Sequence, residues 1–82
     1  MHLRDLELFC EVASLRSFSR AAKALGVSQP AASETIKAIE KQLGLELINR
    51  EQRPLELTAA GEVYLEGCRE LLDSYRRLSD RV

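Results

Sequence analysis

The chain has few aromatic residues and no tryptophan. Its aromatic side chains are Phe9, Phe18, Tyr64 and Tyr75. The core must therefore rest on Leu, Ile, Val and Ala, the main contributors to the 45% of residues that are apolar. Together with 30% charged residues, this composition excludes a disordered chain of low hydrophobicity. The 82 residues allow one small domain, for which burial against a partner chain is plausible.

Cysteine is also scarce, and two cysteines are too few for a disulfide scaffold. Cys10 and Cys68 both fall on apolar stripes of expected helices. We interpret them as small buried hydrophobic side chains in preference to redox or metal-binding residues. The single histidine, His2, stands at the chain start, and the sequence has no phosphate-binding glycine loop and no nucleophile grouped with a base. These absences predict a protein that is not an enzyme and uses no metal or cofactor.

No apolar run approaches the roughly 18 residues that a transmembrane helix needs, and Met1 leads directly into charged sequence in place of a signal peptide. We therefore expect a cytoplasmic protein without membrane contact. The formal net charge of −1 argues against a generally basic DNA-binding protein. Residues 16–37, however, carry four basic residues and one acidic residue. Such a local positive face can contact phosphates, because salt screens the more distant charges.

Apolar residues at helical spacing predict a first helix over residues 3–15. A second, short helix is expected between a serine cap at Ser17 and Gly26, where glycine can adopt the left-handed conformation that ends a helix. A third helix is expected between Ser28 and Gly44 for the same reasons. Its inward face is expected to consist of Ala32, Ile36, Ile39 and Leu43.

Two short extended segments follow, at residues 46–50 and 55–57, around a polar tip that ends in Pro54. Proline has no N–H for a strand ladder, so it suits the tip or edge of a hairpin. Thr58 can then cap a last helix that reaches the end of the chain. The expected order is helix, helix, turn, helix, small hairpin and long helix, which is a mainly α fold.

A very short turn joins the second and third expected helices, in the sequence AAKALGVSQPAASETI. A turn of about three or four residues that contains glycine, between short amphipathic helices, is typical of a helix-turn-helix. Plain helical bundles also contain such corners, so these features alone leave DNA binding and simple helix packing open. The start of the third helix favours DNA binding, because its small and polar side chains would let the backbone approach base edges in a major groove.

Residues at this helix start have chemistry that suits base edges and phosphates. Gln29 can pair with adenine in the bidentate mode, and Ser33 can address a base edge or a phosphate. Pro30 removes a donor that has no intrahelical partner, and Pro30 and Ala31 can contact a thymine methyl group. The free N–H groups at the positive end of the helix dipole also favour a phosphate. The alternative is that Ser-Gln-Pro is merely a good helix start.

The passage SFSRAAKALGVSQPAASETIKAIEKQLGLELINR, followed by RPLELTAAG, resembles the N-terminal DNA-binding domain of LysR-type bacterial transcriptional regulators. The resemblance covers essentially the whole chain and implies a winged helix-turn-helix at residues 1–57. It implies a recognition helix at about 28–43, a wing at 50–55 and a linker and dimerisation helix at 58–82. Two antiparallel linker helices would set two recognition helices on successive major grooves of an inverted-repeat operator in double-stranded DNA.

Family members typically continue into a C-terminal domain that senses a small-molecule effector. Because no cap, glycine or proline ends the last helix at Val82, we expect this chain to be an excised DNA-binding portion without that domain. The resemblance also implies that Arg53, at the tip of the wing, inserts into a narrow minor groove. Further candidates for phosphate contacts are Ser19, Arg20, Lys37 and Arg50.

Two positions depart from the family pattern. Glu34 stands where a basic or amide residue is frequent, and its carboxylate would repel phosphates. It can instead accept a hydrogen bond from cytosine N4, or form a surface ion pair with Lys37, and both alternatives stay open. Ile48 stands where phenylalanine is frequent, which affects packing beneath the wing.

The last helix carries a narrow apolar stripe of coiled-coil type. The residues expected to form the dimer contact are Leu65, Cys68, Leu71, Leu72, Tyr75 and Leu78. The three preceding helices are too few to cover this stripe, so a second copy of the chain is the expected partner, although another face can pack on the first helix. The competing interpretation of the whole chain is a dimeric helical module that binds protein and not DNA.

Overall fold

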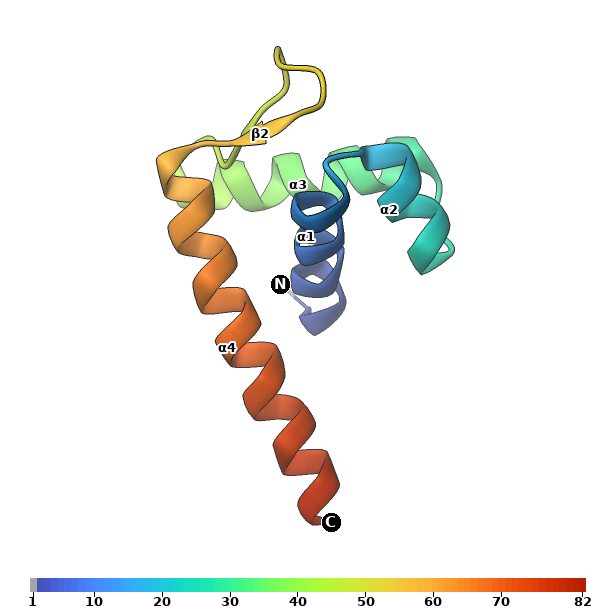
Figure 1. The fold of residues 1–82 in the computed structure, drawn as a ribbon, viewed down its shortest axis with the longest axis vertical. Coiled ribbons are helices and arrows are strands. Elements are labelled where there is room, and N and C mark those ends of the chain that lie inside the picture. Colours follow the sequence, from blue (N-terminus) through green and yellow to red (C-terminus); the bar gives the residue numbers. More distant parts are fainter. Residues whose placement is uncertain (1) are drawn as a thin grey trace.

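The computed structural model describes residues 2–82 as four helices and one small hairpin (Figure 1). The helices are α1 (Leu3–Leu15), α2 (Phe18–Leu25), α3 (Gln29–Leu43) and α4 (Ala59–Arg81). The antiparallel strands are β1 (Ile48–Asn49) and β2 (Glu56–Leu57). This is the predicted order of elements. The strands are shorter than predicted, because only two residues from each of the two extended segments pair with each other.

The predicted helix caps are present. Ser17, Ser28 and Thr58 each accept a hydrogen bond at 3.0 or 3.1 Å from the backbone N–H three residues further on. Gly26 and Gly44 end α2 and α3 with φ angles of 70° and 71°, in the left-handed region that glycine adopts without strain. The end of α2 and the start of α3 are thereby fixed, so the turn between them stays short.

The core lies where α1 packs against the other three helices, and apolar side chains of the hairpin segment complete it. Its largest fully buried side chains are Phe9, Val12, Ile36, Leu47 and Ile48. The core is therefore mainly aliphatic, and in it Phe9 meets Tyr64 edge-on at a centroid distance of 5.2 Å. The prediction for Leu43 is wrong, because this residue is 41% exposed where the last turn of α3 reaches solvent.

The part of α4 up to Leu72 belongs to the same core, whereas the rest of the helix extends away from the body of the molecule (Figure 1). A boundary at residue 58 therefore does not separate two cores. Leu65, Cys68 and Leu72 are 4–7% exposed in the single chain, because α4 packs on α1 along this face. This corrects half of the predicted dimer stripe, since buried side chains offer no surface to a partner. The other three residues of the stripe, Leu71, Tyr75 and Leu78, are exposed.

The start of α4 is joined tightly to the strand that leaves α3. The backbone N–H of Thr58 donates to the backbone oxygen of Leu47 at 3.0 Å. A Cβ added at the buried Gly61 would overlap that same oxygen, whereas a Cβ added at Gly67 would meet nothing within 4 Å. Close backbone packing therefore requires glycine at residue 61 and not at residue 67.

Candidate nucleic-acid interface

The first turns of α3 direct a polar face towards solvent. The residues of the predicted DNA contact that are exposed on this helix are Gln29, Pro30, Ala31, Glu34 and Lys37. Ser33 is half-buried, while Ala32 and Ile36 are buried and anchor the opposite face in the core. The packing therefore orients the small-residue start of the helix outward, as the sequence predicts.

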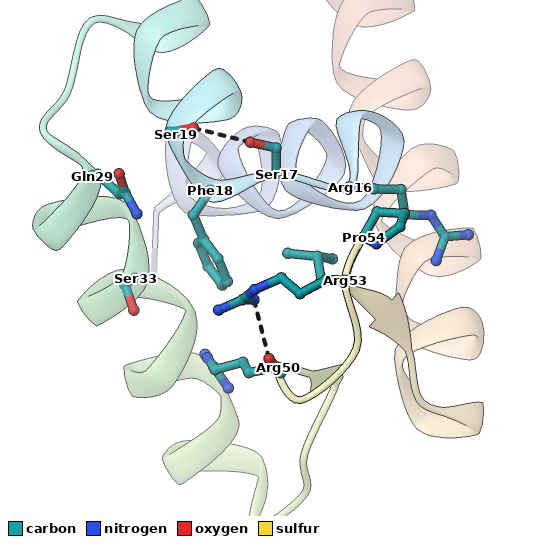
Figure 2. A pocket seen from close by; sticks show the side chains of 10 residues that line it. Arg16, Ser17, Phe18, Ser19, Gln29, Ser33, Arg50, Arg53 and Pro54 are labelled. Carbon is teal, nitrogen blue, oxygen red and sulfur yellow. Dashed lines mark hydrogen bonds between the residues drawn. The ribbon is translucent and has the colours of Figure 1, made fainter.

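A pocket of about 330 Å³ lies between the start of α2, the start of α3 and the hairpin (Figure 2). Its lining residues are Arg16, Ser17, Phe18, Ser19, Gln29, Ser33, Arg50, Arg53, Pro54 and Leu55. They include three arginines and no carboxylate, so the pocket favours anions. The fold thereby brings five predicted contact residues together from three separate segments: Ser19, Gln29, Ser33, Arg50 and Arg53.

Arg53 lies across this pocket in place of extending from the hairpin tip. Its Nη1 donates to the backbone oxygen of Arg50 at 3.2 Å, and Figure 2 shows its side chain directed into the pocket towards α3. Only one of the five N–H donors of the guanidinium is used in this contact, so the others can meet an anion. Insertion of Arg53 into a minor groove stays a prediction, and it requires the side chain to leave the bond to Arg50.

The side chain of Arg50 is held by contacts within the protein. Its Nη1 lies 2.9 Å from Oε1 of Glu40, and its guanidinium carbon lies 5.3 Å from the centre of the Phe18 ring. Its Nε and Nη2 are buried without a hydrogen-bond acceptor, and the electron-rich ring face is the favourable neighbour of this cation. These contacts argue against the predicted role of Arg50 as a phosphate ligand.

The sequence interpretation missed Glu40, which connects α3 to the hairpin. It is the one buried charged residue within the described range 2–82, at 8% exposure. Its Oε2 accepts hydrogen bonds from the backbone N–H groups of Leu47 and Ile48 at 2.7 and 3.2 Å, while its other oxygen pairs with Arg50. The available signal was its position four residues after Ile36, on the inward face of the helix.

The start of α2 contributes hydroxyl and basic groups beside the pocket. Ser19 is exposed, and its hydroxyl shares a hydrogen bond of 3.1 Å with that of Ser17, which caps the helix through the N–H of Arg20. Arg20 is also exposed. Arg16 was not predicted as a contact residue. It ends α1 in the left-handed conformation, with φ of 55°, and lines the pocket.

The alternatives for Glu34 are narrowed by the structure. Across residues 2–82 no ion pair joins Glu34 to Lys37, so the exposed carboxylate has no cation at contact distance.

Residues 2–82 hold no group of three or more His, Cys, Asp or Glu side chains arranged for a metal ion. None of their helices is both long enough and apolar enough to span a bilayer.

A family model described as "Bacterial regulatory helix-turn-helix protein, lysR family" matches residues 3–62. The chain belongs to this LysR family. It is 49% identical over 72 residues to the HTH-type transcriptional regulator BudR of Klebsiella aerogenes, which covers 88% of this chain and 50% of that protein. It is 44% identical over 72 residues to AlsR of Bacillus subtilis, covering 88% of this chain and 24% of that protein. The chain thus spans half or less of the length of these relatives.

Solved LysR-family structures share the architecture over nearly the entire chain. The BenM_DBD/benA site 1 DNA complex has a TM-score of 0.95 at 32% identity and covers 99% of this chain and 91% of that one. The CbnR_DBD–DNA complex has a TM-score of 0.91 at 42% identity and covers 99% and 93%. The predicted mainly α, winged helix-turn-helix fold of a LysR-type N-terminal domain is therefore confirmed, with β1 and β2 as the base of the wing.

Proposed function

We propose that this chain is the DNA-binding portion of a LysR-type transcriptional regulator and that it binds inverted-repeat operators as a homodimer. The exposed, small-residue start of α3 beside an arginine-lined pocket is the observation that carries the proposal. In a helix-turn-helix, the N-terminal residues of the second helix meet base edges in the major groove. The protein acts in the cytoplasm on the nucleoid and has no catalytic role. A small-molecule effector acts through a further domain outside residues 1–82.

The exposed residues divide into base contacts and phosphate contacts. Gln29 pairs with adenine, and Pro30 and Ala31 meet a thymine methyl group. Hydroxyl and basic residues beside these base-contact residues contact the DNA phosphates: Ser19, Arg20, Ser33 and Lys37. Arg53 turns from the pocket into the adjoining minor groove, where a narrow groove concentrates negative potential. Phosphate contacts fix the register, and base contacts supply the sequence preference.

The dimer contact follows the exposed part of the apolar stripe on α4. Leu71, Tyr75 and Leu78 are 51%, 52% and 60% exposed, which leaves apolar surface for a second copy of the helix. This stripe continues into an apolar groove of about 340 Å³ between α1 and α4, whose lining includes Leu6 and Val63. An antiparallel pair of α4 helices would cover both surfaces.

Replacing Leu78 with aspartate tests the dimer. The new carboxylate would have to be buried in the helix pair, so we expect dissociation to increase at least about tenfold, measured by sedimentation equilibrium. Arg77→Asp introduces the same group on a different face of α4 and should leave the dimer intact. Equal sedimentation of both variants as tight dimers would contradict this contact. Leu72→Asp is unsuitable, because Leu72 is buried in the core of a single chain.

DNA binding is tested by fluorescence anisotropy with duplexes that are first selected from a random pool. Roughly 6 to 10 phosphate contacts per complex predict a steep linear fall of log affinity with log salt, together with a clear preference for selected inverted repeats. Binding that is insensitive to salt and equal for random duplex would contradict the proposal. Dimers that retain no DNA at low salt would instead favour the protein-binding module.

A further inference from the structure

The helices α1, α2 and α3 each end on a residue in the left-handed conformation. Gly26 ends α2 with φ of 70°, and Gly44 ends α3 with φ of 71°. Arg16 ends α1 with φ of 55° and ψ of 34°, and within residues 2–82 it is the only residue other than glycine with a positive φ. This conformation is strained for a residue with a side chain, whereas glycine adopts it freely. The backbone at residue 16 therefore suits glycine, yet the chain has arginine there.

No contact within the protein accounts for this arginine. The side chain of Arg16 is exposed, and across residues 2–82 its guanidinium forms no hydrogen bond and no ion pair. The turn uses only its backbone, because the N–H of Arg16 donates to the oxygen of Val12 at 2.9 Å and closes the last turn of α1. Glycine or asparagine would supply the same bond with less strain. The attraction of an exposed guanidinium to the negative end of the α1 dipole is weak, so the side chain is available to a ligand.

The position of Arg16 indicates the chemistry of that ligand. Arg16 and Pro54 both line the arginine-lined pocket, and Figure 2 shows the Arg16 side chain beside Pro54, on the opposite side of the pocket from Gln29. The lining contains no carboxylate, so no group there competes with an anion for this cation. Gly26 and Gly44 do not line the pocket. Of the three helix ends with this geometry, arginine stands at the one that faces the proposed DNA contact.

We propose that Arg16 binds a backbone phosphate at the edge of the minor groove that receives Arg53, as a further DNA contact of this chain. The inference rests on the proposed function, in which Arg53 enters that groove from the wing. Phosphates of both strands border a minor groove only about 6 Å wide, so a cation beside the wing meets one of them. A guanidinium donates paired hydrogen bonds to phosphate oxygens. Because the phosphate is the same at every base pair, Arg16 adds affinity and does not read sequence.

Arg16→Gly tests the proposal, because its expected effects on stability and on binding have opposite signs. The strain at residue 16 disappears, so the urea midpoint of unfolding should rise at matched protein concentration. DNA affinity should fall, because each chain of the dimer loses one phosphate contact. The slope of log affinity against log salt should become shallower by about 1.8, at about 0.9 for each lost contact, which corresponds to a loss of roughly 60-fold at 0.1 M salt. The preference for the selected operator over its single-base variants should not change.

Two matched variants separate a local contact from general charge. Arg16→Lys keeps both the cation and the strained backbone, so it should keep most of the salt slope and the lower urea midpoint. Arg81→Gln removes one positive charge near the far end of α4, which extends away from the body of the molecule (Figure 1), and should leave the slope unchanged. If Arg81→Gln and Arg16→Gly reduce the slope equally, Arg16 acts only through net charge and the proposal is wrong.

Operator duplexes with single uncharged methylphosphonate substitutions locate the contact. At one position beside the minor groove of each half-site, the substitution should weaken binding of the unmodified chain and have no effect on Arg16→Gly. Equal sensitivity of the two proteins at every position would overturn the proposal. So would a lower urea midpoint of Arg16→Gly with unchanged affinity, because Arg16 would then serve α1. Binding of the unmodified chain without salt dependence would remove the proposed function as well, whereas salt-dependent binding without a contribution from Arg16 would remove this inference alone.

Discussion

The first turns of α3 and its last turn lie in different surroundings. At the start, the side chains of Gln29, Pro30 and Ala31 are exposed to solvent. At the end, the carboxylate of Glu40 is buried and binds two backbone N–H groups of the following segment and the guanidinium of Arg50. One helix therefore combines a bare contact surface with a rigid attachment to the wing. The residues that set the geometry of the site are therefore not those that would meet its ligand.

The largest effect is expected from Gly61→Ala. Gly61 lies on α4 and packs against the backbone of Leu47, in the segment that Glu40 attaches to the end of α3. The added methyl group would overlap the backbone oxygen of Leu47, so either α4 or the strand segment must shift. We expect a loss of about 3 kcal/mol or more in the free energy of unfolding, measured with urea. Gly67→Ala, in open space on the same helix, should be neutral or add up to about 1 kcal/mol. Similar stabilities for the two variants would refute the close packing.

Glu40→Ala removes the link between α3 and the wing. Two buried N–H groups lose their acceptor, and the half-buried Arg50 loses its counter-charge, so we expect a loss of about 2–4 kcal/mol in urea unfolding. Glu34→Ala is the matched control on the exposed face of the same helix and should change stability by less than about 0.5 kcal/mol. Equal effects would mean that the buried carboxylate does not hold the wing.

Gln29→Ala tests the bare end of the helix. Stability should change by less than about 0.5 kcal/mol, because the side chain is exposed. Binding to the selected operator should weaken by about 1–3 kcal/mol, and the preference at one base pair should be lost. Competition anisotropy with single-base operator variants measures both effects. An equal loss on every sequence would show that Gln29 contacts the backbone of the DNA and not a base.

The smallest effect is expected from Glu34→Gln. If the carboxylate accepts a hydrogen bond from cytosine, the amide should reduce the preference for cytosine at one position by about 1 kcal/mol. Parallel selection from a random duplex pool with both proteins measures this change. A uniform gain in affinity across all sequences, with an unchanged consensus, would show that the carboxylate only repels phosphates.

Much of this architecture could be predicted from the sequence, because its signals are local. Ser17, Ser28 and Thr58 cap helices through bonds that span three residues, and the two left-handed glycines mark the ends of α2 and α3. The apolar residues of α3 recur at helical spacing, and this periodicity predicts that the polar start of the helix faces outward. These features depend on residues that are close in sequence, so they can be predicted without knowledge of the tertiary contacts.

Contacts between distant segments could not be predicted in the same way. The burial of Glu40 could not be predicted from its charge, since nothing near it in sequence shows that the backbone of Leu47 and Ile48 will supply donors. The stripe on α4 shows that Leu72 is apolar but not whether its own chain or a partner covers it. The position of Arg53 across the pocket likewise depends on where the hairpin lies relative to the starts of α2 and α3.

The most direct test of the contact surface is a nuclear magnetic resonance titration of the isotope-labelled chain with its selected operator duplex. We expect the largest amide shift changes to fall on residues 28–37, with further changes at 17–20 and 50–55. Amides beside the buried carboxylate of Glu40, and those of α1, should change little. Changes confined to α4, or no changes at saturating DNA, would contradict the assignment of α3 as the surface that meets the bases.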